Sequence, residues 1–235
     1  MKQAAAKTGE TRRIARGIVT ATLAMALLTA SSHVARGSDN RALDADILSL
    51  SEQWATAKYL SKDADEIKLR MADLALKADA LAARYPGRAE PLIWSGIITS
   101  ERALLTWGVT ALRLATRARN TLLEAERLDA RALDAGAPTT LGVLYSRVPS
   151  FPLGWGDSAK ARQYLEEAVG KAPSGREARY YCADFLYEQG EYKGAEQLLI
   201  AAMALPQHPE RPIWDKHLVK MMRELLARVR EKLKS

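Results

Sequence analysis

The sequence has 235 residues, of which 48% are hydrophobic and 27% are charged, so it is long enough and apolar enough to bury a globular core. Its formal net charge is +7, from 35 Lys and Arg against 28 Asp and Glu. Residues 1–37 contain six of these basic residues and one acidic residue, so the remainder is nearly balanced and gives no indication of nucleic-acid binding. The single cysteine, Cys182, excludes a disulfide within the chain.

Residues 1–37 have the pattern of a signal peptide. A basic start precedes the apolar run GIVTATLAMALLTA at 17–30, and small residues follow near Ala35 and Gly37. We therefore expect a periplasmic or secreted protein. The alternative is an uncleaved helix that anchors the chain to the inner membrane, although the run is short for a membrane span.

The rest of the chain, 38–235, is expected to be a single all-α domain, because apolar residues recur at intervals of three and four rather than two. Prolines and glycines mark the ends of the expected helices. These helices are placed at 43–60, 64–84, 90–106, 110–128, 138–147, 158–170, 176–188, 192–204 and 212–233.

An internal repeat is visible when GDSAKARQYLEEAV, from Gly156, is laid over GEYKGAEQLLIAAM, from Gly190. The residues that match at a spacing of 34 are Ala161, Leu165 and Ala168 with Ala195, Leu199 and Ala202. This period resembles the tetratricopeptide repeat, a pair of helices that buries its apolar face only by stacking on its neighbours. The resemblance implies helical hairpins at 137–173 and 176–206 in a short right-handed solenoid, closed by a capping helix at 212–233. In that helix the basic residues are expected to face water, and the residues expected to face inward are Ile213, Leu218, Met222, Leu225 and Val229.

The run from GAPTTLGVLYSRVP to GWGDSAKARQYLEEAVGKAPSGREARYYCADFLYEQGEY is similar to the T-component family of TRAP transporters. That family consists of helical-repeat proteins on the periplasmic side of those uptake systems. The resemblance implies that the partner is a periplasmic solute-binding protein. Some relatives are lipoproteins, whereas residues 1–37 contain no cysteine that could carry a lipid.

Nothing in the sequence indicates an enzyme. There is no nucleophile motif, no phosphate-binding glycine loop and no dinucleotide fingerprint. After the signal region only His208 and His217 remain, and neither has the spacing of a metal ligand. We therefore predict no catalytic residue, metal or cofactor.

A binding role is better supported, because the first helix of each repeat lines the concave face of a solenoid. The repeat alignment places nine residues on this face: Ile93, Ile97, Glu101, Thr139, Val143, Arg147, Tyr180, Asp184 and Tyr187. Their chemistry suits a peptide or a small organic ligand. Two alternatives stay open. In the first, Tyr180 and Tyr187 are partly buried packing residues. In the second, the helix around Trp54 and Tyr59 fills the groove.

Two further segments exceed a standard repeat. The turn at 149–155 carries Phe151 and Trp155, which either plug the gap left by the longer turn or form a recognition loop. The segment 94–118 is ten residues longer than its counterpart, and its Trp107 is expected to pack in the core, or else to project as an oligomer contact or a pocket wall. The sequence thus predicts an exported, non-enzymatic binding protein of a TRAP-type system, or alternatively a general envelope scaffold.

Overall fold

The structure is a computed structural model that describes residues 39–234, so the predicted signal peptide lies outside the described residues. The helices are α2 (Ala64–Arg84), α3 (Ala89–Leu104), α4 (Gly108–Asp129), α5 (Ala132–Arg147), α6 (Ser158–Lys171), α7 (Arg176–Glu188), α8 (Tyr192–Ala204) and α9 (Pro212–Lys232). Residues 39–59 are also helical. The chain divides into two compact units between Ala45 and Asp46, and helices α2 to α9 all belong to the second unit.

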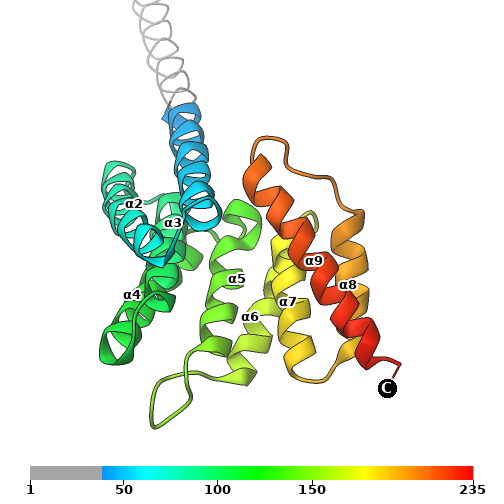
Figure 1. Cartoon of the computed structure of the whole chain (residues 1–235). Helices are drawn as coiled ribbons and strands as arrows, with labels where there is room; N and C mark the ends of the chain where they lie inside the picture. The colour runs from blue at the N-terminus through cyan, green and yellow to red at the C-terminus, as the bar shows by residue number, and fades with distance from the viewer. Residues whose placement is uncertain (1–38, 235) are drawn as a thin grey trace, which may run out of the picture. The chain divides into compact units, whose positions relative to one another are not determined.

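The described residues contain no β-strand, and the all-α helical-repeat fold is confirmed. Neighbouring helices pair as the hairpins α3–α4, α5–α6 and α7–α8. The first helices of these hairpins, together with α9, form one layer, which we call the inner layer. In it α3 contacts α5, α5 contacts α7, and α7 contacts α9 (Figure 1). The second helices, α4, α6 and α8, lie in the other layer.

Small residues allow the two helices of a hairpin to approach closely. A Cβ atom added to Gly96 or to Gly142 would lie 2.5 Å from the Cγ atom of Leu122 or Leu165, respectively. The alanines that the repeat alignment matches are fully buried. This packing of small against large side chains within each hairpin holds the two helix layers together.

The last helix, α9, covers the end of the stack against α7 and α8. Four of its predicted inward residues, Leu218, Met222, Leu225 and Val229, are buried. Ile213, also predicted to face inward, is only half-buried, and Trp214 beside it takes the interior position instead. The predicted bounds of this helix are correct to within one residue.

The start of α5 departs most from prediction. The sequence predicts a helix from residue 138, but the helix begins at Ala132 with a left-handed turn formed by Leu133, Asp134 and Ala135. Pro138 lies in the first turn of the regular part that follows, where its missing N–H costs little. The sequence pattern therefore locates the regular helix and misses the turn before it.

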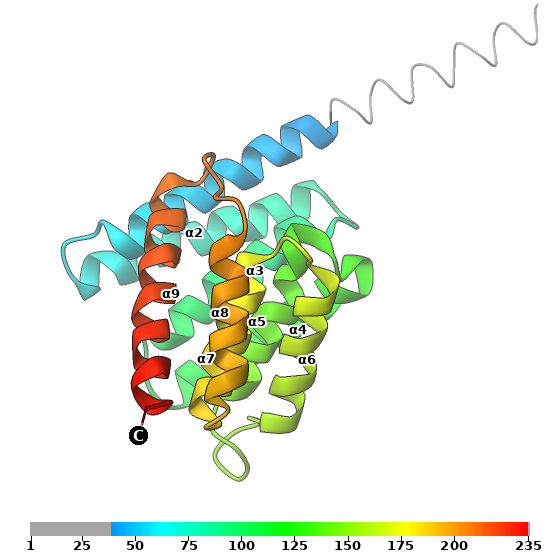
Figure 2. The ribbon, with the colours of Figure 1, turned by 90° about the vertical axis from the view of Figure 1, so that its right-hand side faces the viewer.

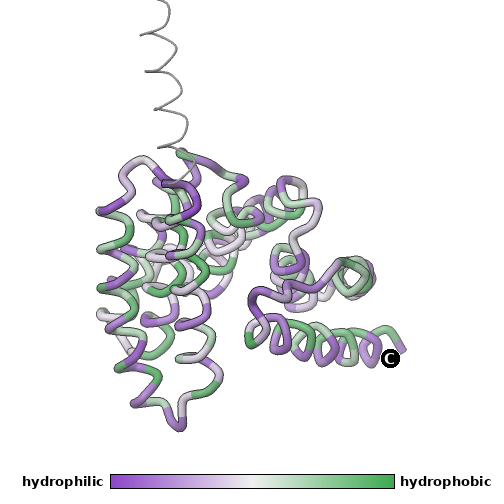
Figure 3. Tube along the Cα trace, turned by 90° about the horizontal axis from the view of Figure 1, so that it is seen from above, coloured by the Kyte–Doolittle hydropathy of each residue, from purple (hydrophilic) through white to green (hydrophobic). Residues whose placement is uncertain are grey.

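Hydrophilic and hydrophobic residues alternate along most of the helices, which are therefore amphipathic rather than uniformly apolar (Figure 3). Among residues 39–234, no helix combines the length and hydropathy that a membrane crossing requires.

Candidate docking face

The predicted groove residues differ in how far they are buried. Ile93 and Thr139 are buried, so they belong to the core, and their prediction as groove residues is wrong. Ile93 is covered by the close approach of α5, where a Cβ on Gly136 would lie 3.0 Å from the Ile93 Cγ2 atom. The half-buried positions are Ile97, Glu101, Val143, Tyr180, Asp184 and Tyr187, and Arg147 is exposed.

One half of the face is filled by the chain itself. Trp54, in the helix that ends at residue 59, is only 5% exposed and lies with its ring centroid 5.6 Å from that of Trp94 in α3 and 5.1 Å from that of Trp214 in α9. Tyr59 stacks on His217 of α9 at 4.1 Å. The part of this helix that belongs to the second unit, residues 46–59, is called helix 46–59 below. It bridges the first and last helices of the inner layer, next to the start of α9 (Figure 2).

Polar contacts reinforce this bridge on both sides. The Lys58 ammonium forms an ion pair with Glu101 of α3 at 2.5 Å, so this predicted groove residue is already engaged. Burial, with the nearby Glu101 carboxylate, raises the pKa of the Tyr59 hydroxyl far above its usual value.

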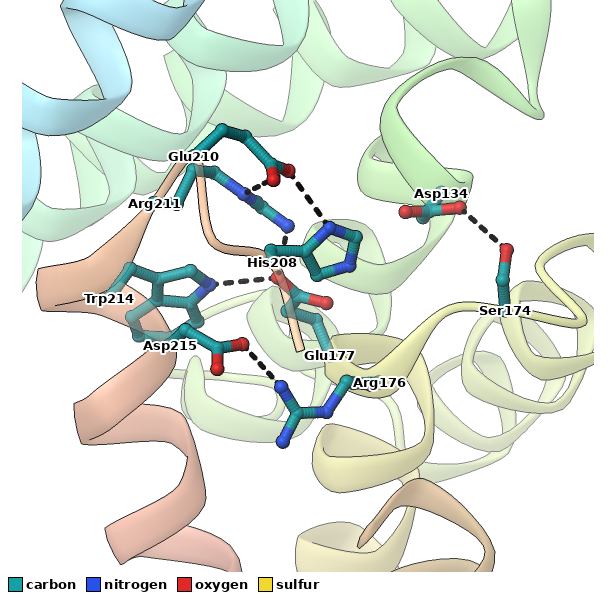
Figure 4. A network of polar contacts seen from close by, with 9 residues as sticks. All are labelled: Asp134, Ser174, Arg176, Glu177, His208, Glu210, Arg211, Trp214 and Asp215. Atoms are coloured by element: carbon teal, nitrogen blue, oxygen red, sulfur yellow. Dashed lines mark hydrogen bonds and ion pairs between the residues drawn. The ribbon is translucent and has the colours of Figure 1, made fainter. Parts of the chain in front are cut away.

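A network at the start of α7 fixes the orientation of Trp214 (Figure 4). The Trp214 Nε1–H group donates to the Glu177 Oε1 atom at 2.8 Å, and Arg211 contacts the same oxygen at 3.2 Å. The Arg176 guanidinium donates to the Asp215 carboxylate, and both side chains are almost completely buried. Because a buried charge is tolerated only beside its partner, this pair fixes α9 against α7 and aims Trp214 at Trp54.

In the other half of the face, no ring contact or ion pair joins the described residues to helix 46–59, although Tyr180 is near enough to Tyr59 to raise the pKa of its hydroxyl. Here Arg147 of α5 pairs with Asp184 of α7, and the Arg228 guanidinium of α9 lies over the Tyr187 ring, 4.3 Å from its centroid. Burial raises the pKa of Asp184, and the Arg147 charge partly opposes this. Burial and the neighbouring Asp184 also raise the pKa of Tyr180 to about 12.

We call Arg147, Tyr180, Asp184, Tyr187 and Arg228 the free half of the face. These residues come from three successive inner helices, and they combine aromatic surface with exposed cations. Such a surface can pack on an apolar side chain and donate to a carboxylate or carbonyl at the same time. Its chemistry is that of a binding surface.

The two aromatic residues of the loop 148–157 lie in different surroundings. Trp155 is half-buried: its Nε1–H donates to Thr116 Oγ1 of α4 at 3.0 Å, its ring lies 5.1 Å from that of Tyr145, and the Arg119 guanidinium covers it at 4.4 Å. Phe151 is 90% exposed. Trp155 therefore fills space between the loop, α4 and α5, as a plug would, whereas Phe151 at the tip of the loop fills none.

Trp107 also departs from prediction. The sequence favours core packing for it, but it is 90% exposed, and its neighbours Leu104 and Val109 are exposed as well. The reason is local: α3 ends at Leu104 instead of continuing to 106, and Trp107 becomes the extended residue before α4. A side chain at such a reversal points away from both helices.

Within residues 39–234, no group of three or more His, Cys, Asp and Glu side chains is placed to hold a metal ion. The Cys182 thiol is buried, which raises its pKa to about 11 and leaves little thiolate at neutral pH. Two hollows open on the surface elsewhere. One of about 370 Å³ lies between helix 46–59 and α2, and one of about 170 Å³ lies among α2, α3 and α4.

Sequence reasoning does not find Trp214, His217 or Arg228 as parts of this face. All three are in α9, which is predicted only as a cap with its basic residues in water. A signal is present, because Trp214 and the aromatic residues Trp54 and Tyr59 are too apolar for exposed positions at both ends of a repeat array. Their meeting cannot be deduced from a repeat period.

Comparison with known families gives one match. Residues 154–214 match the tetratricopeptide repeat. This segment contains α6, α7 and α8 and the first turn of α9, the part in which the 34-residue period occurs. No curated protein matches the chain. Tetratricopeptide-type repeats generally act as non-catalytic scaffolds that bind other proteins.

Proposed function

We propose that the protein is a non-enzymatic docking protein that binds a segment of a partner protein on the free half of its concave face. The observation that carries the proposal is the bridge made by helix 46–59. Its Trp54 and Tyr59 rings pack on the same layer of inner helices, so this layer accommodates a helical segment through aromatic contacts. The free half offers Tyr187, Arg228 and Arg147 for a second segment.

The proposal extends to location and partner. The pattern of residues 1–37 supports export to the periplasm, with retention at the inner membrane as the alternative. The resemblance to TRAP transporter T components supports a periplasmic solute-binding subunit as the partner. Docking would hold this subunit near its membrane components and would involve no covalent chemistry. The competing function is a general envelope scaffold, which the tetratricopeptide match supports equally well.

The test measures binding of a purified TRAP solute-binding subunit to the protein by calorimetry. Tyr187→Ala should weaken binding by about 1–2 kcal/mol, because it removes an aromatic contact at the centre of the free half. The matched control is Tyr164→Ala on α6, in the other helix layer, which should leave the affinity unchanged. Equal affinities for all three proteins would exclude this face. Absence of binding by the wild-type protein would exclude the transporter partner and favour the general scaffold.

A further inference from the structure

A second surface of the molecule lies at one end of the hairpins, away from the concave face. Two chain reversals carry large apolar side chains that are almost fully exposed: Leu104, Trp107 and Val109 at the α3–α4 turn, and Phe151 and Leu153 in the α5–α6 loop. We call these five residues the apolar end. Trp107 and Phe151 are each 90% exposed.

Topology places both reversals at the same end of the helices. Residues 130–131 connect α4 to α5, so the start of α4 and the end of α5 both lie at the opposite end from this connection. The α5–α6 loop is also tied to α4 by the hydrogen bond from Trp155 to Thr116. Figure 1 shows the loop below α5 and α6 and the start of α4 on the same lower side.

The smaller hollow adjoins this end. It has a volume of about 170 Å³ and is lined by Leu105, Thr106, Thr110 and Leu114 of the turn and α4, by Ala72 of α2, and by the basic side chains of Lys68 and Arg102. Among residues 39–234, neither Lys68 nor Arg102 forms an ion pair, whereas Arg84, Arg117, Arg147 and Arg230 each pair with a carboxylate of another helix. The hollow therefore presents two uncompensated cations over an apolar floor.

We propose that the apolar end docks on a lipid bilayer surface that contains anionic phospholipids. Trp107, Phe151 and the three aliphatic residues would enter the boundary between headgroups and acyl chains, where aromatic and leucine side chains are favoured. Lys68 and Arg102 would hold a lipid phosphate at the mouth of the hollow. The helices themselves stay outside the bilayer.

The geometry favours a bilayer over a second protein. A stable protein interface needs a continuous face of about 800 Å² on each partner. The five apolar residues instead occupy two separate reversals, and each can enter a fluid surface independently. Unpaired Lys68 is also better suited to a phosphate layer, since lysine is depleted in protein interfaces.

The tryptophans provide a direct test. Of the five in the sequence, Trp54, Trp94 and Trp214 are buried, and Trp155 is half-buried in the α5–α6 loop, so the part of a lipid-induced emission change that Trp107→Phe abolishes reports Trp107. Residues 1–38 contain no tryptophan, so the apolar run at 17–30 gives no emission of its own, and the Lys68, Arg102 variant described below separates its binding from that of the apolar end. The full chain is mixed with phosphatidylcholine vesicles with and without phosphatidylglycerol, and with the same vesicles made from brominated lipids.

A blue shift and bromine quenching that require phosphatidylglycerol would support the proposal. The Lys68→Gln, Arg102→Gln double variant should reduce the partition that this signal reports by about thirtyfold, from the usual contribution of a basic residue near an anionic surface. The matched control is Arg127→Gln, Lys216→Gln, which removes two exposed cations from the other end of the helices and should change nothing.

Three results would overturn the proposal. One is an emission spectrum unaffected by either vesicle, and another is an unchanged signal in the Lys68, Arg102 variant. The third is self-association without lipid that Trp107→Ala abolishes, which would assign the apolar end to a second copy of the chain. None of these results bears on the free half of the concave face, so the partner proposal is tested separately.

Discussion

Replacing Trp54 by alanine tests whether helix 46–59 is an integral part of the fold. Trp54 is 5% exposed and contacts the rings of Trp94 and Trp214. Truncation of a buried tryptophan to alanine costs about 3–5 kcal/mol, because it removes the burial of the ring and leaves a cavity. No hydrogen bond is lost, since the Trp54 Nε1 atom has no partner among the described residues. We therefore expect the free energy of unfolding to fall by about 3–5 kcal/mol.

The assay is urea unfolding followed by far-UV circular dichroism, with Trp107→Ala as the matched control. Trp107 is 90% exposed, so the same substitution there should change stability by less than about 0.5 kcal/mol. A loss below about 1 kcal/mol for Trp54→Ala would refute the reasoning, because removing a ring buried between two helices lowers the free energy of unfolding by more than this. Equal losses for the two variants would refute it as well.

Three other predictions use the same unfolding assay or its native baseline. Arg176→Met should cost about 3–5 kcal/mol because it leaves the buried Asp215 carboxylate without its partner, whereas the double variant Arg176→Met, Asp215→Leu should recover most of this loss. Gly142→Ala should destabilise the α5–α6 hairpin by about 1–3 kcal/mol through its contact with α6, whereas Gly170→Ala, with no atom within 4 Å of the new methyl group, should stabilise it by up to about 1 kcal/mol. Cys182, with a pKa raised to about 11, should resist iodoacetamide at pH 8 in the folded protein and react once urea unfolds it; rapid reaction of the native protein would contradict its burial.

The helices are predictable because their ends are encoded locally. The bounds 64–84, 176–188 and 192–204 agree with α2, α7 and α8 at both ends. Asp63 caps the start of α2 by accepting from the Glu66 N–H, as expected for an acidic residue at a helix start. The close contact of Gly142 with Leu165 places a small residue of α5 against a large residue of α6.

The site is less predictable because its contacts join distant parts of the chain. Trp54 and Trp214 are 160 residues apart, and no repeat period relates a helix before the array to the helix that ends it. The alignment also places Ile93 on the inner face without revealing that α5 covers it. The prediction for Trp107 is wrong because hydrophobicity alone favours burial, whereas the backbone of a helix reversal decides where the side chain points.

The bridge made by helix 46–59 limits where a partner can bind. If this helix contributes about 3–5 kcal/mol, a partner that has to displace it would lose between about a hundredfold and a few thousandfold in affinity. The half of the face that contains Trp94, Trp214 and His217 is therefore occupied by the chain's own helix, however favourable its aromatic side chains look for binding. A partner avoids this cost only on the free half, where Arg147 and Arg228 are already balanced by Asp184 and Glu188. A segment that contributes its own carboxylate would have to compete with these pairs, so apolar contact with Tyr187 should determine affinity, and the charged residues should determine which segments are accepted.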